Sequence, residues 1–270
     1  MTDAPIQSGS LLNRLNVTAV NDIGELVLRV TPVSTTSRAG SIRISVLSYV
    51  IDALAGIAVD TDPDAWTFTS DMSVRMRPVP APLYAQGSSQ SLRVGHRSAT
   101  CEVRLFDDAC EQVAYGALGF SRVARRPTDA QKIILDTETA KRLWGGVQPI
   151  DIPLPDAAGI RVVDGPAGVV ELDLDPGLLN TAGALQGAMV ALVAEVAAEE
   201  AASNRLGAPA LICEIDLRYL HQARGGPVRT ECEWLGDGPF APMVVRLVDV
   251  PTGQLLTHVI TRATPPPETP

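Results

Sequence analysis

The chain has 270 residues, of which 46% are hydrophobic and 20% charged, enough for one large globular domain or two ordinary ones. Its net charge of −9 argues against nucleic acid or an anionic membrane surface as the main partner, because both need a basic footprint. The first residues lack the basic and apolar regions of a signal peptide, and no apolar run approaches the roughly 20 residues that span a bilayer. We therefore expect a cytoplasmic protein without a membrane partner.

The sequence contains no pattern typical of a metal or cofactor site. The cysteines are scattered, with no C-x-x-C pair and no histidine at ligand spacing, which favours free thiols in a reducing compartment. GxGxxG, P-loop and metal-ligand motifs are also missing from it, so we expect neither a metal nor a cofactor. The cysteines are Cys101, Cys110, Cys213 and Cys232.

The first part of the chain, residues 10–124, is predicted to form one helix followed by a run of strands. It opens with an alternating strand at residues 24–32. After a loop, an apolar helix is predicted over residues 41–60, ending before Pro63. Alternating or β-rich segments, separated by polar or glycine-containing turns, then predict strands over residues 66–77, 84–95, 98–107 and 111–123.

Residues 125–158 are proline-rich and polar, and we interpret them as an ordered linker. A threonine or aspartate N-cap and a closing glycine pair predict a short helix over residues 136–146. Residues 159–264 repeat the order of the first part, with an apolar helix within residues 180–202, and the tail beyond them is expected to fray. The predicted strands of this second part are residues 168–176, 210–220, 228–236, 243–250 and 254–263.

The two parts share residues at a constant spacing. A glycine, an acid, a strand residue and a basic residue of the first part each have a counterpart 143 positions later. The motif VRLFD at residues 103–107 returns as VRLVD at residues 245–249, with a spacing of 142. Chance does not easily give such an offset, so we predict two copies of one unit. The matched pairs are Gly40 with Gly183, Asp52 with Glu195, Asp71 with Glu214 and Arg75 with Arg218.

One long helix followed by antiparallel strands is typical of the α+β class. The helix in each copy is apolar almost all round, and such a helix has to be wrapped by other structure. We therefore predict tandem units in which a curled antiparallel sheet wraps around a central helix.

The start of the second helix carries a family resemblance. Residues 180–188, NTAGALQGA, followed by Glu195, resemble the Asn-x-x-Gly-x-x-His-Gly-Gly motif, with a downstream acid, of acyl-CoA thioesterases of the phenylacetate-pathway type. The strand-turn-strand of residues 91–107 is similar to the one that follows in that superfamily. The resemblance covers nearly the whole chain apart from the linker and tails, and implies a double hotdog fold. The sequence departs from the motif at Gln186, which replaces the histidine, and at Ala188, which replaces the second glycine.

Thioester hydrolysis needs an oxyanion site, and the N-terminus of a buried helix supplies one through its free N–H groups and its dipole. Gly187 leaves room for a carbonyl oxygen to approach the backbone. Asn180 and Gln186 carry amide donors for the same oxygen or for a water, although a turn or cap residue would also explain Asn180. We expect Gly183 and Ala188 to complete the substrate-binding turn.

The resemblance implies a composite site, because in family members the helix start of one unit faces the mid-helix acid of the other. The acid that works with the turn at Asn180 is then Asp52, not Glu195. Thr69 lies 17 residues after Asp52, where relatives carry an assisting hydroxyl, and its counterpart Ile212 has none. The first copy has Ile44 where the second has its helix-start glycine, which predicts a blocked pocket there.

Two routes for Asp52 stay open: a general base on a water that Thr69 orients, or a direct nucleophile. Its apolar neighbours argue against the alternative of an exposed helix carboxylate. We expect Glu195 to be vestigial, and Glu199 and Glu200 to be solvated. His96 and Arg97, in the turn VGHRS, are candidates for contact with CoA phosphates, although a solvated turn also explains them.

Acyl-CoA thioester hydrolysis is thus the predicted activity. The alternatives are a non-catalytic acyl-CoA-binding protein and a hotdog hydratase or dehydratase, although neither copy has a histidine where hydratases use an Asp–His pair. The sequence leaves open the length of the acyl chain, whether the thioester is to CoA or to an acyl-carrier protein, and whether the chain associates into a homo-oligomer.

Overall fold

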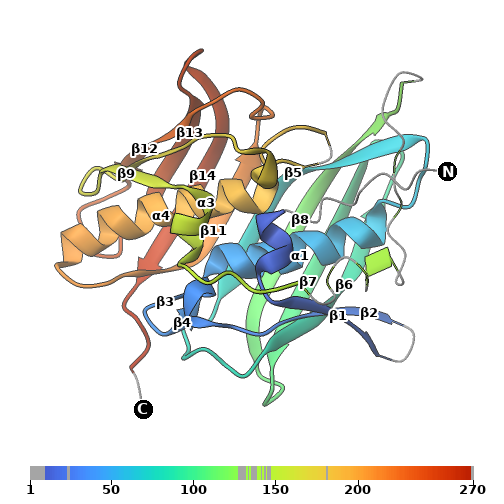
Figure 1. The fold of residues 1–270 in the computed structure, drawn as a ribbon, viewed down its shortest axis with the longest axis horizontal. Helices are drawn as coiled ribbons and strands as arrows, with labels where there is room; N and C mark the ends of the chain where they lie inside the picture. The colour runs from blue at the N-terminus through green and yellow to red at the C-terminus, as the bar shows by residue number, and fades with distance from the viewer. Residues whose placement is uncertain are drawn as a thin grey trace.

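The structure, a computed structural model, describes residues 10–22, 25–126, 147–180 and 182–268, with Lys132, Ile134, Thr139, Ala140, Arg142 and Trp144 between them. One antiparallel sheet runs through the described residues, and two helices, α1 and α4, lie against it (Figure 1). The strand order of the sheet is β1-β2-β6-β7-β8-β5-β11-β14-β13-β12-β10-β9.

The first half of the chain supplies one side of the sheet and helix α1, Ile44–Val59. Short 3-10 turns, η1 and η2, and the small hairpin β3–β4 precede the helix. These elements are η1 Leu11–Arg14, η2 Ser34–Thr36, β3 Ser37–Arg38 and β4 Ser41–Ile42. The strands of the large sheet are β1 Val17–Asp22, β2 Glu25–Val30, β5 Ala65–Met76, β6 Ala85–Val94, β7 Ser98–Asp107 and β8 Gln112–Ala124.

The second half supplies the other side of the sheet and helix α4, Gly187–Leu206. A short helix and a 3-10 turn, α3 Leu154–Ala158 and η3 Pro176–Leu178, precede α4. The strands are β9 Arg161–Asp164, β10 Val169–Leu172, β11 Leu211–Tyr219, β12 Val228–Trp234, β13 Met243–Asp249 and β14 Gln254–Thr264.

The two halves meet where β5 pairs with β11. Ser73 lies opposite Asp216, and these two residues are 143 positions apart. On either side of this pair, Met72 faces Leu217 and Val74 faces Ile215, so each strand presents equivalent positions to the other. The strand order shows the same symmetry about the β5–β11 pair. Counted from the outside of the sheet toward that pair, one side has the order β2, β6, β7, β8, β5 and the other has the order β10, β12, β13, β14, β11.

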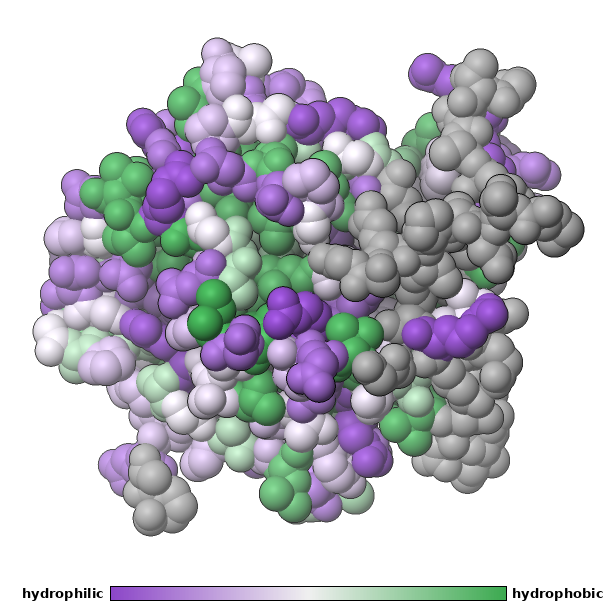
Figure 2. Space-filling model, viewed as in Figure 1, coloured by the Kyte–Doolittle hydropathy of each residue, from purple (hydrophilic) through white to green (hydrophobic). Residues whose placement is uncertain are grey.

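Helices α1 and α4 pack against each other and against the sheet (Figure 1). Large side chains such as Ile51, Met189 and Leu192 are at most 1% exposed, and burial of each stabilises the fold by about 1.5–3 kcal/mol. Helix α4 ends at Gly207, whose φ of +66° closes it in the left-handed conformation that glycine adopts without strain. On the face drawn in Figure 2, hydrophobic side chains gather near the centre, among hydrophilic ones.

The predicted helices and strands are found close to their expected positions. The first helix begins at Ile44 rather than at Ser41, because Ser41 and Ile42 pair with residues 37–38 as the hairpin β3–β4. The edge strands β1 and β9 were not predicted. Most of the helix expected over residues 136–146 lies outside the described residues.

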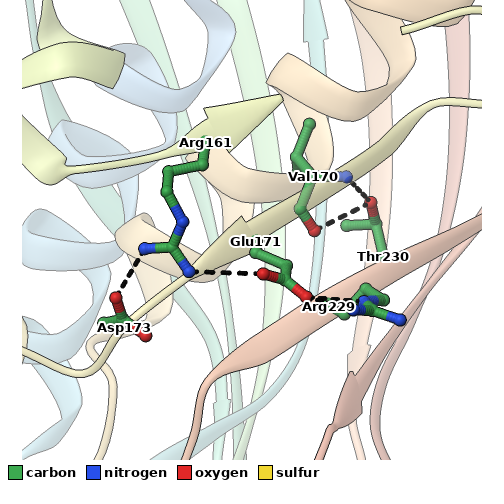
Figure 3. Close-up of polar contacts among 6 residues, drawn as sticks. All are labelled: Arg161, Val170, Glu171, Asp173, Arg229 and Thr230. Carbon is green, nitrogen blue, oxygen red and sulfur yellow. Dashed lines mark hydrogen bonds and ion pairs between the residues drawn. The ribbon is translucent and has the colours of Figure 1, made fainter. Parts of the chain in front are cut away.

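The end of the sheet formed by β9, β10 and β12 is held by polar contacts (Figure 3). Glu171 on β10 bridges Arg161 on β9 and Arg229 on β12. The buried Thr230 hydroxyl accepts a hydrogen bond from the Val170 N–H at 2.9 Å and donates to the carbonyl of Gly168. These side chains bridge a stretch where β10 and β12 pair through only two registered positions.

Membrane-spanning and metal-binding features were sought among the described residues. No helix there combines the length and apolar character needed to cross a membrane. The histidine, cysteine, aspartate and glutamate side chains of that same part of the chain do not gather into a metal-binding group.

Candidate active site

A cavity of about 860 Å³ lies between the two halves. The first half lines it with residues of α1 and β5, including Asp52 and Thr69. The second half lines it with the start of α4 and with Tyr219 at the end of β11. All five residues predicted for catalysis, Asp52, Thr69, Asn180, Gln186 and Gly187, are therefore brought to one cavity by elements far apart in the sequence.

Asp52 projects from the middle of α1 into this cavity. Its carboxylate accepts a hydrogen bond from the Thr69 hydroxyl at 2.7 Å. Burial raises the pKa of Asp52, while the Thr69 bond acts in the opposite direction because it favours the ionised form. A carboxyl group with a raised pKa, held by one hydroxyl and facing a cavity, has the properties of a general base.

The start of α4 forms the facing wall. Gln186 is its N-cap, and the side-chain oxygen of Gln186 accepts the Ala188 N–H at 2.5 Å. Among the residues that the structure describes, none accepts a hydrogen bond from the Gly187 N–H. Gly187 lines the cavity, so this N–H is the donor at the positive end of the helix that is available to an oxygen there.

Asn180 shapes the turn that leads into α4. Its side-chain oxygen accepts the N–H groups of Ala182 and Ala184 at 2.9 and 3.1 Å, so it acts as a turn residue as well as lining the cavity. Gly183 follows with a φ of +71°, which glycine adopts without strain, and is exposed. Gly183 and Ala188 are absent from the cavity lining, and their part in the site is to form the turn and the first helical peptide.

A second, closed half-site lies at the start of α1, between residues 43–45 and the acids of α4. Glu195 is fully buried and accepts the backbone N–H groups of Ile44 and Ser45 at 3.0 and 3.3 Å. The Ser45 hydroxyl also donates to it. The mid-helix acid of one half therefore binds the helix start of the other, and the carboxylate fills the place that an external anion would take.

Glu199 is also buried in the closed half-site, so the expectation that it is solvated is wrong. It is 1% exposed and binds the Arg43 guanidinium at 2.9 Å, with Arg38 at 3.7 Å. Burial, and to a smaller extent the charge of Glu195, raise the pKa of Glu199 to about 7 against the opposing effect of Arg43. The sequence did not reveal this cluster because its members come from different halves.

His96 and Arg97 lie in the exposed turn between β6 and β7 and do not line the cavity. Their proposed contact with CoA has no support from this arrangement.

One described residue of the linker, Trp144, is bound to helix α1 beside the cavity. Trp144 is 6% exposed and donates its indole N–H to the Tyr49 hydroxyl at 2.8 Å. Both residues line the cavity, as do Lys132 and Thr139. This contact could not be predicted from the sequence, because a proline-rich linker carries no periodicity that assigns a side chain to a site.

Tyr219 is a cavity residue that sequence reasoning missed. Its hydroxyl donates to the Gly187 carbonyl at 3.1 Å. Burial, and then the charge of Asp52, raise its pKa well above the ordinary value. The constant spacing of 143 held a usable signal, because the residue 143 positions before Tyr219 is Met76, which has no hydroxyl.

Solved structures share this fold over most of the chain. An acyl-ACP thioesterase from Bacteroides thetaiotaomicron is 11% identical and aligns 88% of this chain with 97% of its own, at a TM-score of 0.57. The tesB protein of Mycobacterium avium subspecies paratuberculosis is 14% identical, with 95% and 98% aligned and a TM-score of 0.60. A protein of unknown function with a hot dog fold, from Alicyclobacillus acidocaldarius, is 9% identical, with 96% and 98% aligned and a TM-score of 0.57.

These likenesses confirm the α+β class and the hotdog fold, and with them the resemblance to hotdog thioesterases at the level of the fold. No protein-family model and no curated protein matches the sequence.

Proposed function

We propose that the chain hydrolyses acyl thioesters, with acyl-CoA as the substrate, at one composite site formed by two hotdog units. The units are residues 10–124 and 159–264, two copies of one repeat joined by the linker 125–158. The mirrored strand order and the symmetric pairing of β5 with β11 support the repeat. A thioesterase among the proteins of the same fold supports the reaction.

The observation that carries the proposal is the difference between the two half-sites. At the closed half-site, Glu195 occupies the N–H groups that begin α1. Its counterpart Asp52 is one methylene shorter and is held by Thr69. The N–H of Gly187 therefore stays available in the cavity. The equivalent donor of α1, the N–H of Ile44, is already bound by Glu195.

In the proposed mechanism, the Gly187 N–H and the amide of Gln186 hydrogen-bond the thioester carbonyl oxygen. One such donor contributes about 10²–10³ in rate to an acyl-transfer enzyme, because its bond strengthens as negative charge develops. Asp52 removes a proton from a water that Thr69 helps to orient, or attacks the carbonyl carbon itself. On the first route the hydroxide adds to the carbonyl carbon, the C–S bond breaks to leave the free acid, and the proton held by Asp52 passes to the CoA thiolate. On the second route the C–S bond breaks to leave an anhydride between the acyl group and Asp52, which water then hydrolyses to the free acid while the CoA thiolate takes up a proton from that water.

The pH dependence of the rate follows from the raised pKa of Asp52. The base works when ionised, so kcat/KM should fall as the pH is lowered through a pKa above that of an ordinary aspartate. Thr69→Val removes a hydrogen bond that favours the ionised form, so the acid limb should move to higher pH. A pH–rate profile of both proteins measures this, and an unchanged limb in Thr69→Val would contradict the role of the hydroxyl.

The activity is tested with a panel of acyl-CoA esters and a thiol-reactive dye. Continuous release of free thiol beyond one equivalent per protein is expected. Saturable binding without release would favour the non-catalytic acyl-CoA-binding protein instead. A change in enoyl absorbance without thiol release would favour a hydratase. The same panel with acyl-carrier-protein thioesters distinguishes the two thiol carriers.

A further inference from the structure

Tyr219 packs against the first residue of α4, Gly187. Its hydroxyl donates to the Gly187 carbonyl at 3.1 Å. A methyl group added at the Cα of Gly187 would lie 3.1 Å from the same hydroxyl oxygen and 3.5 Å from the ring carbon that bears it. The phenol and the glycine are therefore fitted to each other, and both face the cavity.

The peptide between Gly187 and Ala188 links this phenol to Gln186. Its carbonyl accepts from Tyr219, and its N–H donates to the side-chain oxygen of Gln186 at 2.5 Å. Hydrogen bonds at the two ends of one peptide polarise each other and strengthen both. Tyr219 thus acts on the Gln186 side chain without touching it.

This chain of bonds fixes which end of the Gln186 amide faces the substrate. A backbone N–H can only donate, so the atom that meets Ala188 has to be the side-chain oxygen. The NH₂ group, with its two donors, is then the end left for the cavity that Gln186 lines. A donor at this position suits a carbonyl oxygen that gains negative charge.

Tyr219 also keeps its proton over the working range of the site. Burial and the nearby charge of Asp52 both disfavour the phenolate. The hydroxyl therefore remains a donor when Asp52 is ionised. The closed half-site has no such chain, because Met76 replaces the phenol and Arg43 replaces the amide.

We propose that Tyr219 is a positioning residue, which acts through the Gly187–Ala188 peptide to hold the Gln186 amide with its NH₂ group toward the substrate carbonyl. The chemical identity of that carbonyl, a thioester, rests on the proposed function. The bonds from Tyr219 to Gln186 do not.

The first arm of the test is kinetic. Tyr219→Phe keeps the ring and should lower kcat about five- to tenfold, the value of one hydrogen bond, with KM within about twofold. In the Gln186→Ala background, the same change should have no further effect on kcat, because the group through which it acts is gone. Independent, multiplicative losses in the double variant would overturn the proposal.

The second arm does not depend on turnover. The Ala188 amide proton should move upfield in the NMR spectrum of Tyr219→Phe, since its bond to Gln186 loses the polarising partner. Tyr115→Phe is the matched control, because Tyr115 on β8 donates to Glu102 on β7 and does not line this cavity. It should leave both the Ala188 resonance and kcat unchanged.

An unshifted Ala188 resonance in Tyr219→Phe would overturn the proposal. If the wild-type protein hydrolysed no thioester while the Ala188 resonance moved as expected, the proposed function would fail and the positioning role of Tyr219 would stand.

Discussion

Replacing Asp52 with asparagine is expected to lower kcat for acyl-CoA hydrolysis by about 10²- to 10⁴-fold, the contribution of a positioned general base. The amide keeps the size of the carboxylate and can still accept from the Thr69 hydroxyl at 2.7 Å. It cannot take a proton from water or attack a carbonyl. Loss of thiol release with retained acyl-CoA binding, measured by the dye assay and by calorimetry, is the expected pair of results.

The same variant should fold at least as well as the wild type. Burial raises the pKa of Asp52 in the folded state, so ionisation of Asp52 destabilises the fold. The free energy of unfolding of the wild type therefore falls as the pH rises through this raised pKa. Asp52→Asn cannot ionise and escapes this loss. A thermal unfolding midpoint at pH 8 equal to or above that of the wild type would exclude misfolding as the cause of inactivity.

Glu195→Gln is expected to do the reverse: stability falls and turnover per folded molecule is retained. The Glu195 carboxylate is buried and binds two backbone N–H groups at the start of α1. It also lies 3.7 Å from the guanidinium of Arg43. Removal of one partner from a buried ionic cluster costs about 3–5 kcal/mol, which corresponds to a fall in Tm of roughly 10 °C for a chain of this size.

Chemical denaturation and thermal unfolding measure that loss, and kcat is measured at a temperature where the variant is folded. Glu200→Gln is the matched control, since Glu200 lies on the same helix but is only half-buried. An inactive but stable Glu195→Gln variant beside an active Asp52→Asn variant would reverse the assignment of the two half-sites.

The regular elements could be predicted from the sequence because their patterns are local. The alternation in residues 98–107 and the apolar run of α4 each follow from the face that the element buries. The constant spacing of 143 identified the corresponding residues of the two halves, and the family resemblance implied that the acid of one half meets the helix start of the other, as Glu195 does at Ile44. The edge strand β9 escaped prediction because all four of its residues are exposed, so it has no buried face to impose a pattern.

The details of the site could not be predicted, because they depend on contacts between the halves. The sequence showed Glu195 as an idle acid, whereas it caps a helix 151 residues away in the chain. It showed Gln186 as a donor, and the structure adds that its oxygen is engaged by Ala188. Tyr219 and Trp144 were missed for the same reason, since their partners Gly187 and Tyr49 are remote in sequence.

The central claim is that the start of α4 works with Asp52 from the other half. A crystal structure of Asp52→Asn with an unhydrolysed acyl-CoA tests it most directly. The account predicts the thioester carbonyl oxygen at about 3 Å from the Gly187 nitrogen, with the side chain at position 52 facing the carbonyl carbon. A thioester bound at the start of α1 beside Glu195, or outside the cavity between the halves, would contradict it.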